Sequence, residues 1–266
     1  MRQAFDKACG VLALQMITYA LFTFQNMRQI FLLLGTSPSD LVISATVAAV
    51  GCVTGIAVVA GMGLLATADL DPRPWRWQRK RILLPALLVC FTCLFPAIGT
   101  PWPLGVGALI ANPVQVIPYF GVFLLMATGE ELLSRGVIQT LLLPYGAGRA
   151  AVISAFMYGI MHLGAYERAD FSPFKTAISL AGVTMLGFGF AVLRDKTKAL
   201  LPVALLHALW NEFVALADTC YRIGCETWAM AQTPWIRWGL YLLPAFLIWI
   251  YALIIWRTDN RHKTQY

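Results

Sequence analysis

Residues 41–67, LVISATVAAVGCVTGIAVVAGMGLLAT, form an apolar run without a charged side chain, long enough to cross a lipid bilayer as a helix. Other apolar runs of helical length lie on both sides of it along the chain. They predict about eight spans, at residues 8–24, 41–67, 82–99, 114–143, 150–165, 175–193, 199–217 and 236–256. We therefore expect an all-α polytopic membrane protein, with residues 1–266 forming a single transmembrane domain.

The composition excludes most other classes of protein. The 266 residues are 59% hydrophobic and 12% charged, and the mean hydropathy is +0.69. A soluble domain carries about 25% charged residues, so this surface cannot face water on all sides. A water-soluble enzyme, a disordered tail, a collagen-like chain and a secreted disulfide scaffold are all excluded.

The distribution of lysine and arginine predicts the orientation of the spans. With both termini in the cytoplasm, fourteen cations fall on the inside: Arg2, Lys7, Arg73, Arg76, Arg79, Lys80, Arg81, Arg149, Arg194, Lys196, Lys198, Arg257, Arg261 and Lys263. Five fall on the outside: Arg28, Arg168, Lys175, Arg222 and Arg237. Membrane proteins carry such an excess in their cytoplasmic loops, so cytoplasmic termini are expected.

The net charge of +7 does not indicate nucleic-acid binding. The cations lie in short loops between apolar runs, where they contact anionic lipid, and no zinc-finger, basic-helix or RNA-binding motif is present. The start of the sequence lacks a small-residue cleavage site, which favours an uncleaved first span over a signal peptide. We expect a multi-pass protein of the plasma membrane, most consistent with a bacterial inner membrane.

Cysteines and glycines give weaker structural signals. The CxxC at residues 90–93 lies in an apolar span, where thiols usually act as small hydrophobic groups. Cys220 and Cys225 lie in the last outside loop, where a disulfide can form in an oxidising compartment. The spacing of Gly51 and Gly55 permits close contact between helices and is weak evidence for a dimer.

Ionisable side chains inside spans are the strongest functional signal. Each costs roughly 2.5–3.5 kcal/mol at a helix centre on insertion scales, so a purely structural span avoids them. The ionisable residues within the predicted spans, with one neutral polar neighbour, are Glu130, Glu131, Arg135, His162, His207, Asn211 and Glu212. They lie on three spans, with none in the first three. Glu212 has no evident role.

The fourth span contains two adjacent carboxylates. Glu131 and Arg135 are four residues apart, so they share a helix face and can form an ion pair. Glu130 is rotated by about 100° from Glu131 and need not be neutralised by the arginine. A structural ion pair explains Glu131 and Arg135 but leaves Glu130 available for proton chemistry.

Two further spans place polar groups at a matching depth. Tyr158 lies one turn before His162, and His207 shares a helix face with Asn211. At 1.5 Å per residue from the cytoplasmic end, Glu130 lies about 20 Å deep, His162 about 18 Å, His207 about 12 Å and Asn211 about 18 Å. These depths agree within roughly two helical turns, so the four side chains can line one cavity.

Such a cavity suits hydrolysis of a peptide bond. Glu130 and an imidazole can hold a water and remove its proton as it attacks a carbonyl carbon. Asn211 and the second histidine can donate hydrogen bonds to the resulting oxyanion. We therefore expect peptide hydrolysis within the bilayer.

Three motifs occur in order along this region: EExxxR from Glu130, aromatic-xxx-His from Tyr158, and HxxxN from His207. This set resembles the CPBP family of intramembrane glutamic endopeptidases, the CAAX proteases and bacteriocin-processing enzymes also called the Abi family. The resemblance covers roughly residues 114–215, the predicted catalytic core. The ordered set is specific, although each motif alone is weak.

The resemblance implies a role for each motif residue. Glu130 and His162 would activate the water, and His207 with Asn211 would form the oxyanion hole. The residues expected to organise the site are Glu131, Arg135 and Tyr158. The family commonly has phenylalanine at the position of Tyr158, and tyrosine keeps the ring while adding a hydroxyl. The implied substrate is a prenylated CAAX-type tail or another membrane-bound peptide, with no cofactor.

Other functions stay open at this point. Glu130, His162 and His207 can supply three zinc ligands with an open position, as in a zinc-dependent membrane protease. Intramembrane Glu and His can also form the relay of a proton-coupled transporter, although a transporter would spread polar residues along a path. A non-catalytic immunity or scaffold protein could carry the same motifs without turnover.

Overall fold

The computed structural model describes residues 2–36, 38–65, 81–88, 113–163, 173–222 and 234–263. All regular structure in these ranges is helical, and no strand occurs in them. The predicted all-α class is therefore confirmed for the described part of the chain.

Eight α-helices, one short helical run, a π-helix, a one-turn α-helix and a one-turn 3₁₀ helix follow one another along these ranges. In chain order they are α1 (Arg2–Leu21), α2 (Phe24–Leu33), α3 (Asp40–Gly61), the run at 81–88, α6 (Pro113–Glu131), the π-helix η1 (Leu132–Ile138), α7 (Gln139–Leu142), the 3₁₀ helix η2 (Leu143–Tyr145), α8 (Ala147–Met161), α10 (Pro173–Thr197), α11 (Leu201–Arg222) and α12 (Pro234–Lys263).

Each predicted span overlaps a helix in the described residues. Two single helices are long and apolar enough to cross a membrane, Asp40–Gly61 and Thr176–Thr197. The helices Arg2–Leu21 and Gln25–Leu33, bent by 53° relative to each other, pass the same test together. The described residues thus hold two such spans, or three with the bent pair; eight spans with cytoplasmic termini stay a prediction.

Some predictions fall on residues outside the described ranges. Of the predicted span 82–99, only residues up to 88 are described, as a helix that packs Ile82 into the core. The CxxC at 90–93 and the side chains of Cys220 and Cys225 lie outside the described part of the chain. The disulfide prediction is therefore not tested.

Local signals in the sequence set several helix ends. The Ser39 hydroxyl accepts a hydrogen bond from the backbone N–H of Val42 at 3.4 Å, which caps the start of α3. Gly146 has φ of 98° at the turn into α8, a conformation that glycine adopts without steric cost. Lys198 has φ of 50° in the tight turn between α10 and α11.

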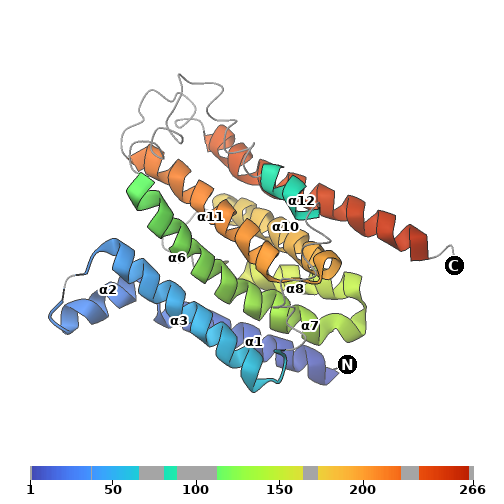
Figure 1. Ribbon diagram of the computed structural model, residues 1–266, viewed down its shortest axis with the longest axis horizontal. Helices are drawn as coiled ribbons and strands as arrows, with labels where there is room; N and C mark the ends of the chain where they lie inside the picture. The colour runs from blue at the N-terminus through green and yellow to red at the C-terminus, as the bar shows by residue number, and fades with distance from the viewer. Residues whose placement is uncertain are drawn as a thin grey trace.

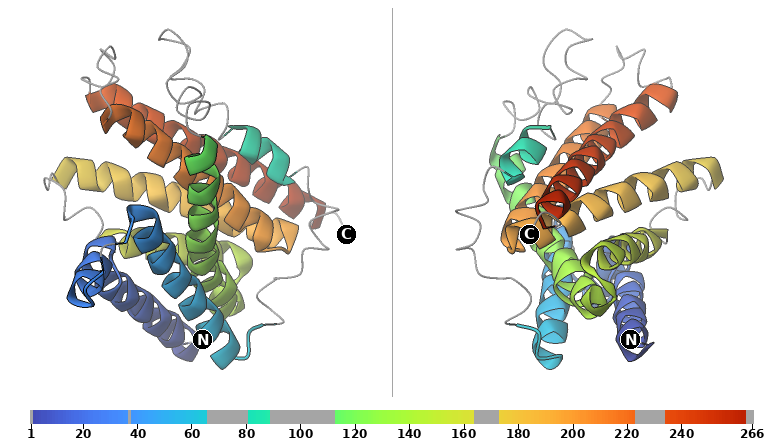
Figure 2. Two further views of the ribbon diagram at one scale, coloured as in Figure 1. Left: turned by 60° about the vertical axis from the view of Figure 1, so that its left-hand side comes forward. Right: turned by 90° about the vertical axis from the view of Figure 1, so that its right-hand side faces the viewer.

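The helices form one bundle with α6 near its middle (Figure 1). Helix α6 packs against α3 on one side and α11 on the other, while α10 packs against both α8 and α12. The first helix, α1, contacts η1 and α7. Both views in Figure 2 place α1 and α3 at the opposite side of the molecule from α12. Residues that meet at the centre therefore come from distant parts of the sequence.

Glycines bring α3 and α6 into backbone contact one residue before Glu130. A Cβ added to Gly129 would lie 2.7 Å from the carbonyl carbon of Gly51 and 2.8 Å from the nitrogen of Cys52. A Cβ added to Gly55 would lie 3.1 Å from the carbonyl oxygen of Gly129. Gly51 and Gly55 thus make a close contact between two helices of the same chain, and this contact holds α6, the helix that carries Glu130, against α3.

Replacing Gly129 by alanine is expected to lower stability by about 1–3 kcal/mol, because the new methyl group meets backbone atoms that cannot rotate away. Thermal unfolding in detergent micelles measures the effect. The matched control is Gly121→Ala on the same helix, where an added Cβ meets nothing within 4 Å. Equal melting temperatures for the two variants would contradict the close contact between α3 and α6.

Candidate active site

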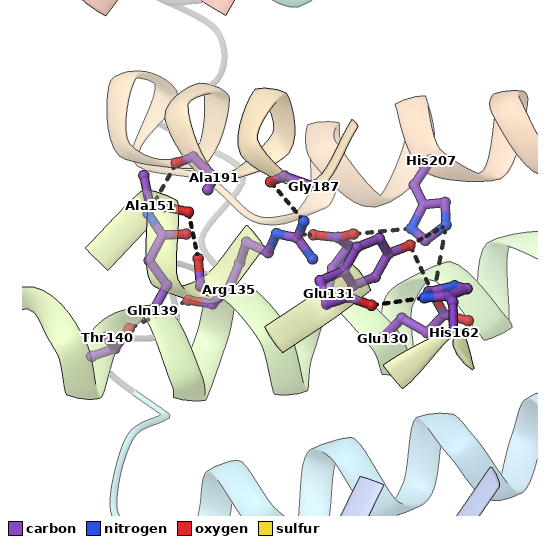
Figure 3. A network of polar contacts seen from close by, with 12 residues as sticks. Glu130, Glu131, Arg135, Gln139, Thr140, Ala151, His162, Gly187, Ala191 and His207 are labelled. Carbon is purple, nitrogen blue, oxygen red and sulfur yellow. Dashed lines mark hydrogen bonds and ion pairs between the residues drawn. The ribbon is translucent and has the colours of Figure 1, made fainter. Parts of the chain in front are cut away.

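The predicted site residues come from three neighbouring helical segments. Glu130 and Glu131 end α6, Tyr158 lies in the last turn of α8 and His162 caps it, and His207 lies in α11. Because α6 packs against α11 and α8 contacts η1, these side chains converge (Figure 3).

Glu130 is buried, and both of its carboxylate oxygens accept hydrogen bonds from tyrosines. The Tyr19 hydroxyl donates to Oε1 at 2.6 Å, and the Tyr158 hydroxyl donates to Oε2 at 3.1 Å. Glu130 is 5% exposed, so these two donors replace hydration that the carboxylate has lost. The carboxylate is therefore held at a defined position rather than left free to rotate.

Two imidazole nitrogens approach the same carboxylate oxygen. Nε2 of His162 lies 3.8 Å from Oε2 of Glu130, and Nε2 of His207 lies 3.7 Å from it. Both distances are too long for a direct hydrogen bond. Nδ1 of His162 lies 2.9 Å from the carbonyl oxygen of Tyr158, which can only accept, so the proton of the neutral ring lies on Nδ1. This leaves the lone pair of Nε2 facing the carboxylate.

His207 links the two glutamates. Its Nδ1 donates to Oε1 of Glu131 at 2.9 Å, and its Nε2 lies 3.1 Å from the Tyr158 hydroxyl. While that hydroxyl donates to an ionised Glu130, the Nε2 contact requires an N–H on His207. Tyr158 thus lies between Glu130 and His207, and His207 lies between Tyr158 and Glu131.

Glu131 and Arg135 form the ion pair that their spacing predicts. Nε of Arg135 lies 3.2 Å from Oε2 of Glu131, and both side chains are 0% exposed. The guanidinium also donates to the carbonyl oxygen of Gly187 at 2.8 Å and lies 4.3 Å from the centre of the Tyr158 ring. Arg135 therefore joins α6 and η1 to α8 and α10 at the base of the site.

The π-helix η1 and the one-turn helix α7 that follows it each direct one polar side chain toward α10. The wider turns of η1 follow Glu131, and π-turns of this kind often occur at functional sites. Arg135 donates to the carbonyl of Gly187, and Gln139 donates to the carbonyl of Ala191 at 3.0 Å, one turn further along α10. A Cβ on Gly187 would lie 2.9 Å from the Tyr158 ring, so only glycine allows this close approach.

Asn211 is not part of the hydrogen-bonded cluster. It lies one turn beyond His207 on α11, is partly buried, and makes no hydrogen bond to a described residue. Glu212 beside it is 7% exposed, and its Oε2 has no partner among the described residues. The structure thus links all the predicted site residues through hydrogen bonds and ion pairs except Asn211, which lies one turn from His207 on the same helix.

Tyr19 is a residue at the candidate site that the sequence analysis missed. It lies on α1, in the first predicted span, where the sequence analysis named no candidate site residue. The available signal was Gln15 and Tyr19, four residues apart in an otherwise apolar run. Gln15 is 1% exposed, which shows that this face of α1 is turned into the protein.

The described residues contain no group of three or more His, Cys, Asp or Glu side chains placed to hold a metal ion. Glu131 and Arg135 neutralise each other, and Glu130 accepts from two hydroxyls. What the arrangement offers chemically is a positioned carboxylate beside an imidazole lone pair.

Comparison with known proteins connects this geometry to one family. No curated protein and no solved structure matches the chain. The segment that does match a family model includes both glutamates, Arg135, Tyr158 and both histidines, and leaves out Tyr19. Residues 112–213 match the model described as type II CAAX prenyl endopeptidase Rce1-like, in agreement with the CPBP resemblance carried by the ordered motifs.

Proposed function

We propose that this protein is an intramembrane glutamic endopeptidase that hydrolyses a peptide bond in a membrane-bound substrate. The observation that carries the proposal is the convergence of the Glu130 carboxylate with the Nε2 atoms of His162 and His207, at 3.8 and 3.7 Å. The match of residues 112–213 to a family of proteases supports the same reaction class.

Glu130 and His162 are placed to bind the attacking water between them. A water with hydrogen bonds of about 2.8 Å to each of two atoms 3.8 Å apart forms an ordinary bent bridge. In this bridge the water donates one hydrogen bond to Nε2 of His162 and the other to Oε2 of Glu130. The water oxygen is then aimed away from both groups, toward a substrate carbonyl.

The reaction follows from this placement. The water oxygen forms a bond to the carbonyl carbon while its proton passes to Glu130. The carbonyl oxygen becomes an oxyanion, for which the N–H of His207 and the amide of Asn211 are the proposed donors. Glu130 then returns the proton to the leaving nitrogen as the C–N bond breaks, which restores the carboxylate.

Glu131 and Arg135 support this cycle from below the site. Glu131 accepts from Nδ1 of His207, which keeps Nε2 directed at the reaction centre. Arg135 fixes Glu131 in turn. We propose both as organising residues, together with Tyr158, whose hydroxyl contacts Glu130 and His207.

The proposed substrate is a prenylated CAAX-type tail, because the matched family model describes CAAX prenyl endopeptidases. We propose that the protein lies in a plasma membrane, most consistent with a bacterial inner membrane, with eight spans and cytoplasmic termini. An apolar helical surface in such a membrane suits a lipid-modified peptide. Another membrane-bound peptide is the second candidate, since the catalytic groups contact only the peptide bond.

The experiment uses the purified full chain in detergent micelles with an internally quenched peptide that ends in a farnesylated CAAX tail. Cleavage that depends on Glu130 is expected, and it should weaken strongly for the same peptide without the farnesyl group. Equal cleavage of both peptides would support the proposed endopeptidase activity but contradict the proposal that the substrate has to be prenylated. Absence of any new termini, in the peptide and in expressing cells, would favour the transporter or scaffold alternatives.

Metal removal tests the zinc alternative. We expect the rate of cleavage to stay within twofold after treatment with 1,10-phenanthroline and dialysis, because carboxylate and imidazole activate the water without a metal. The control is the same chelator on a known zinc protease in the same detergent. Loss of activity that zinc restores would show that Glu130, His162 and His207 act as metal ligands.

A further inference from the structure

The first helix contributes a side chain to the site from outside the segment that matches the family model. Tyr19 on α1 donates to Oε1 of Glu130 at 2.6 Å, across 111 residues of sequence. The matched segment begins at residue 112, so this contact does not follow from the match. A hydrogen bond from a hydroxyl to an ionised carboxylate is shorter and stronger than one between neutral groups.

The packing of α1 holds the Tyr19 ring in place. Ala8, Val11, Gln15 and Tyr19 repeat at helical spacing, and the first three are buried. The Tyr19 ring packs against a core cluster that includes Tyr158. The hydroxyl therefore reaches Glu130 from a ring that the fold has already oriented, at little further cost in side-chain entropy.

The two oxygens of Glu130 have different surroundings. Oε2 accepts from Tyr158 and lies near both histidines. Oε1 has Tyr19 as its only hydrogen-bond partner among the described residues. Without the Tyr19 hydroxyl, only the hydrogen bond from Tyr158 to Oε2 restrains rotation of the carboxylate about the Cγ–Cδ bond of Glu130. Oε2 can then move away from His162.

We propose that Tyr19 is a positioning residue for Glu130, and this proposal rests on the protease function proposed above. The hydroxyl fixes the carboxylate plane so that Oε2 stays directed at the bound water. A displacement of about 1 Å in a catalytic group can cost on the order of 100-fold in rate. The effect falls on the chemical step, because Tyr19 contacts the base rather than the peptide bond.

Tyr19→Phe removes the hydroxyl and keeps the ring. In the farnesylated-peptide assay we expect kcat to fall about 10- to 100-fold while KM stays within twofold. The matched control is Tyr119→Phe, in α6, where the hydroxyl makes no hydrogen bond to a described residue. This control should keep kcat and KM within twofold of the unmodified protein.

Infrared difference spectroscopy provides a readout that does not need activity. The carboxylate band of Glu130, assigned by its loss in Glu130→Gln, should shift in Tyr19→Phe and stay in place in Tyr119→Phe. An unshifted band, or a kcat within twofold of the unmodified protein, would overturn the positioning role. A fall in kcat with an unshifted band and lower thermal stability would show a structural role and also overturn it.

The two proposals fail in different ways. If the unmodified protein cleaves no peptide, the proposed protease function is wrong. The positioning role is then wrong as well, even if the band shift confirms the hydrogen bond between Tyr19 and Glu130. If the unmodified protein cleaves the peptide and Tyr19→Phe does so equally well, only the inference about Tyr19 fails.

Discussion

Glu130→Gln is expected to reduce peptide cleavage by about 10²- to 10⁴-fold, the usual contribution of a general base. Glutamine has nearly the same shape and still offers a carbonyl oxygen to one tyrosine hydroxyl. It cannot accept a proton from water, so the chemical step is lost while the packing is kept. The measurement is the rate of cleavage of the farnesylated peptide, at equal protein level and with unchanged thermal unfolding.

Glu212→Gln is the matched control for this substitution. Glu212 is also a buried glutamate, lies in α11 five residues after His207, and has an Oε2 without a partner among the described residues. Its replacement should leave the rate within twofold. Activity retained by Glu130→Gln, or lost equally in both variants, would contradict the assignment of Glu130 as the base.

Arg135→Met is expected to lower the free energy of unfolding by about 3–5 kcal/mol, the usual cost of breaking a fully buried ion pair. The substitution leaves Glu131 charged in a site where both side chains are 0% exposed. It also removes the donor to the Gly187 carbonyl and the cation over the Tyr158 ring. Denaturant unfolding in detergent micelles measures the loss.

The double variant Glu131→Gln/Arg135→Met distinguishes charge from shape. Removing both charges leaves no uncompensated ion, so much of the lost stability should return. Activity should not return, because His207 has lost the carboxylate that accepts from its Nδ1. A single variant that costs less than about 1 kcal/mol, or a double variant as unstable as the single one, would contradict this role for the pair.

Helix positions were predictable because a helix that crosses a membrane has to be both apolar and long enough to span the bilayer. The predicted runs at 150–165 and 175–193 coincide with α8 (Ala147–Met161) and α10 (Pro173–Thr197) within four residues at each end. The run at 114–143 covers four successive elements of three kinds, from α6 through η1 and α7 to the first residue of η2. Hydropathy does not distinguish α from π turns, because both bury the same side chains.

The beginning of the chain was predicted less well. The run at 8–24 coincides with α1, but the helix begins at Arg2, and a cap at Thr23 starts a second helix. The charged first turns are helical without being apolar, so they leave no hydropathy signal. The bend depends on the Thr23 side chain accepting from the N–H of Asn26, a local hydrogen bond that a window average does not contain.

The site was predictable to the extent that unusual residues reveal it. Glu130, His162 and His207 stood out because charge inside an apolar run is costly, and their similar depths allowed them to meet. Tyr19 escaped because tyrosine is common in spans and carries no charge. The depth expected for Asn211 does not fix the direction of its side chain, which makes no hydrogen bond to a described residue.

The contacts of Glu131 and Arg135 have a consequence for synthesis of the chain. Their partners Gly187 and His207 lie 52 and 76 residues further along. A ribosome that adds about 5–20 residues per second takes about 4–15 s to supply that longer stretch. During this interval the two charges lack their hydrogen bonds to α10 and α11, and lipid is a poor solvent for both. The proposed membrane span at α6 therefore implies that the newly made helix stays beside water or the insertion machinery until α10 and α11 arrive to enclose it.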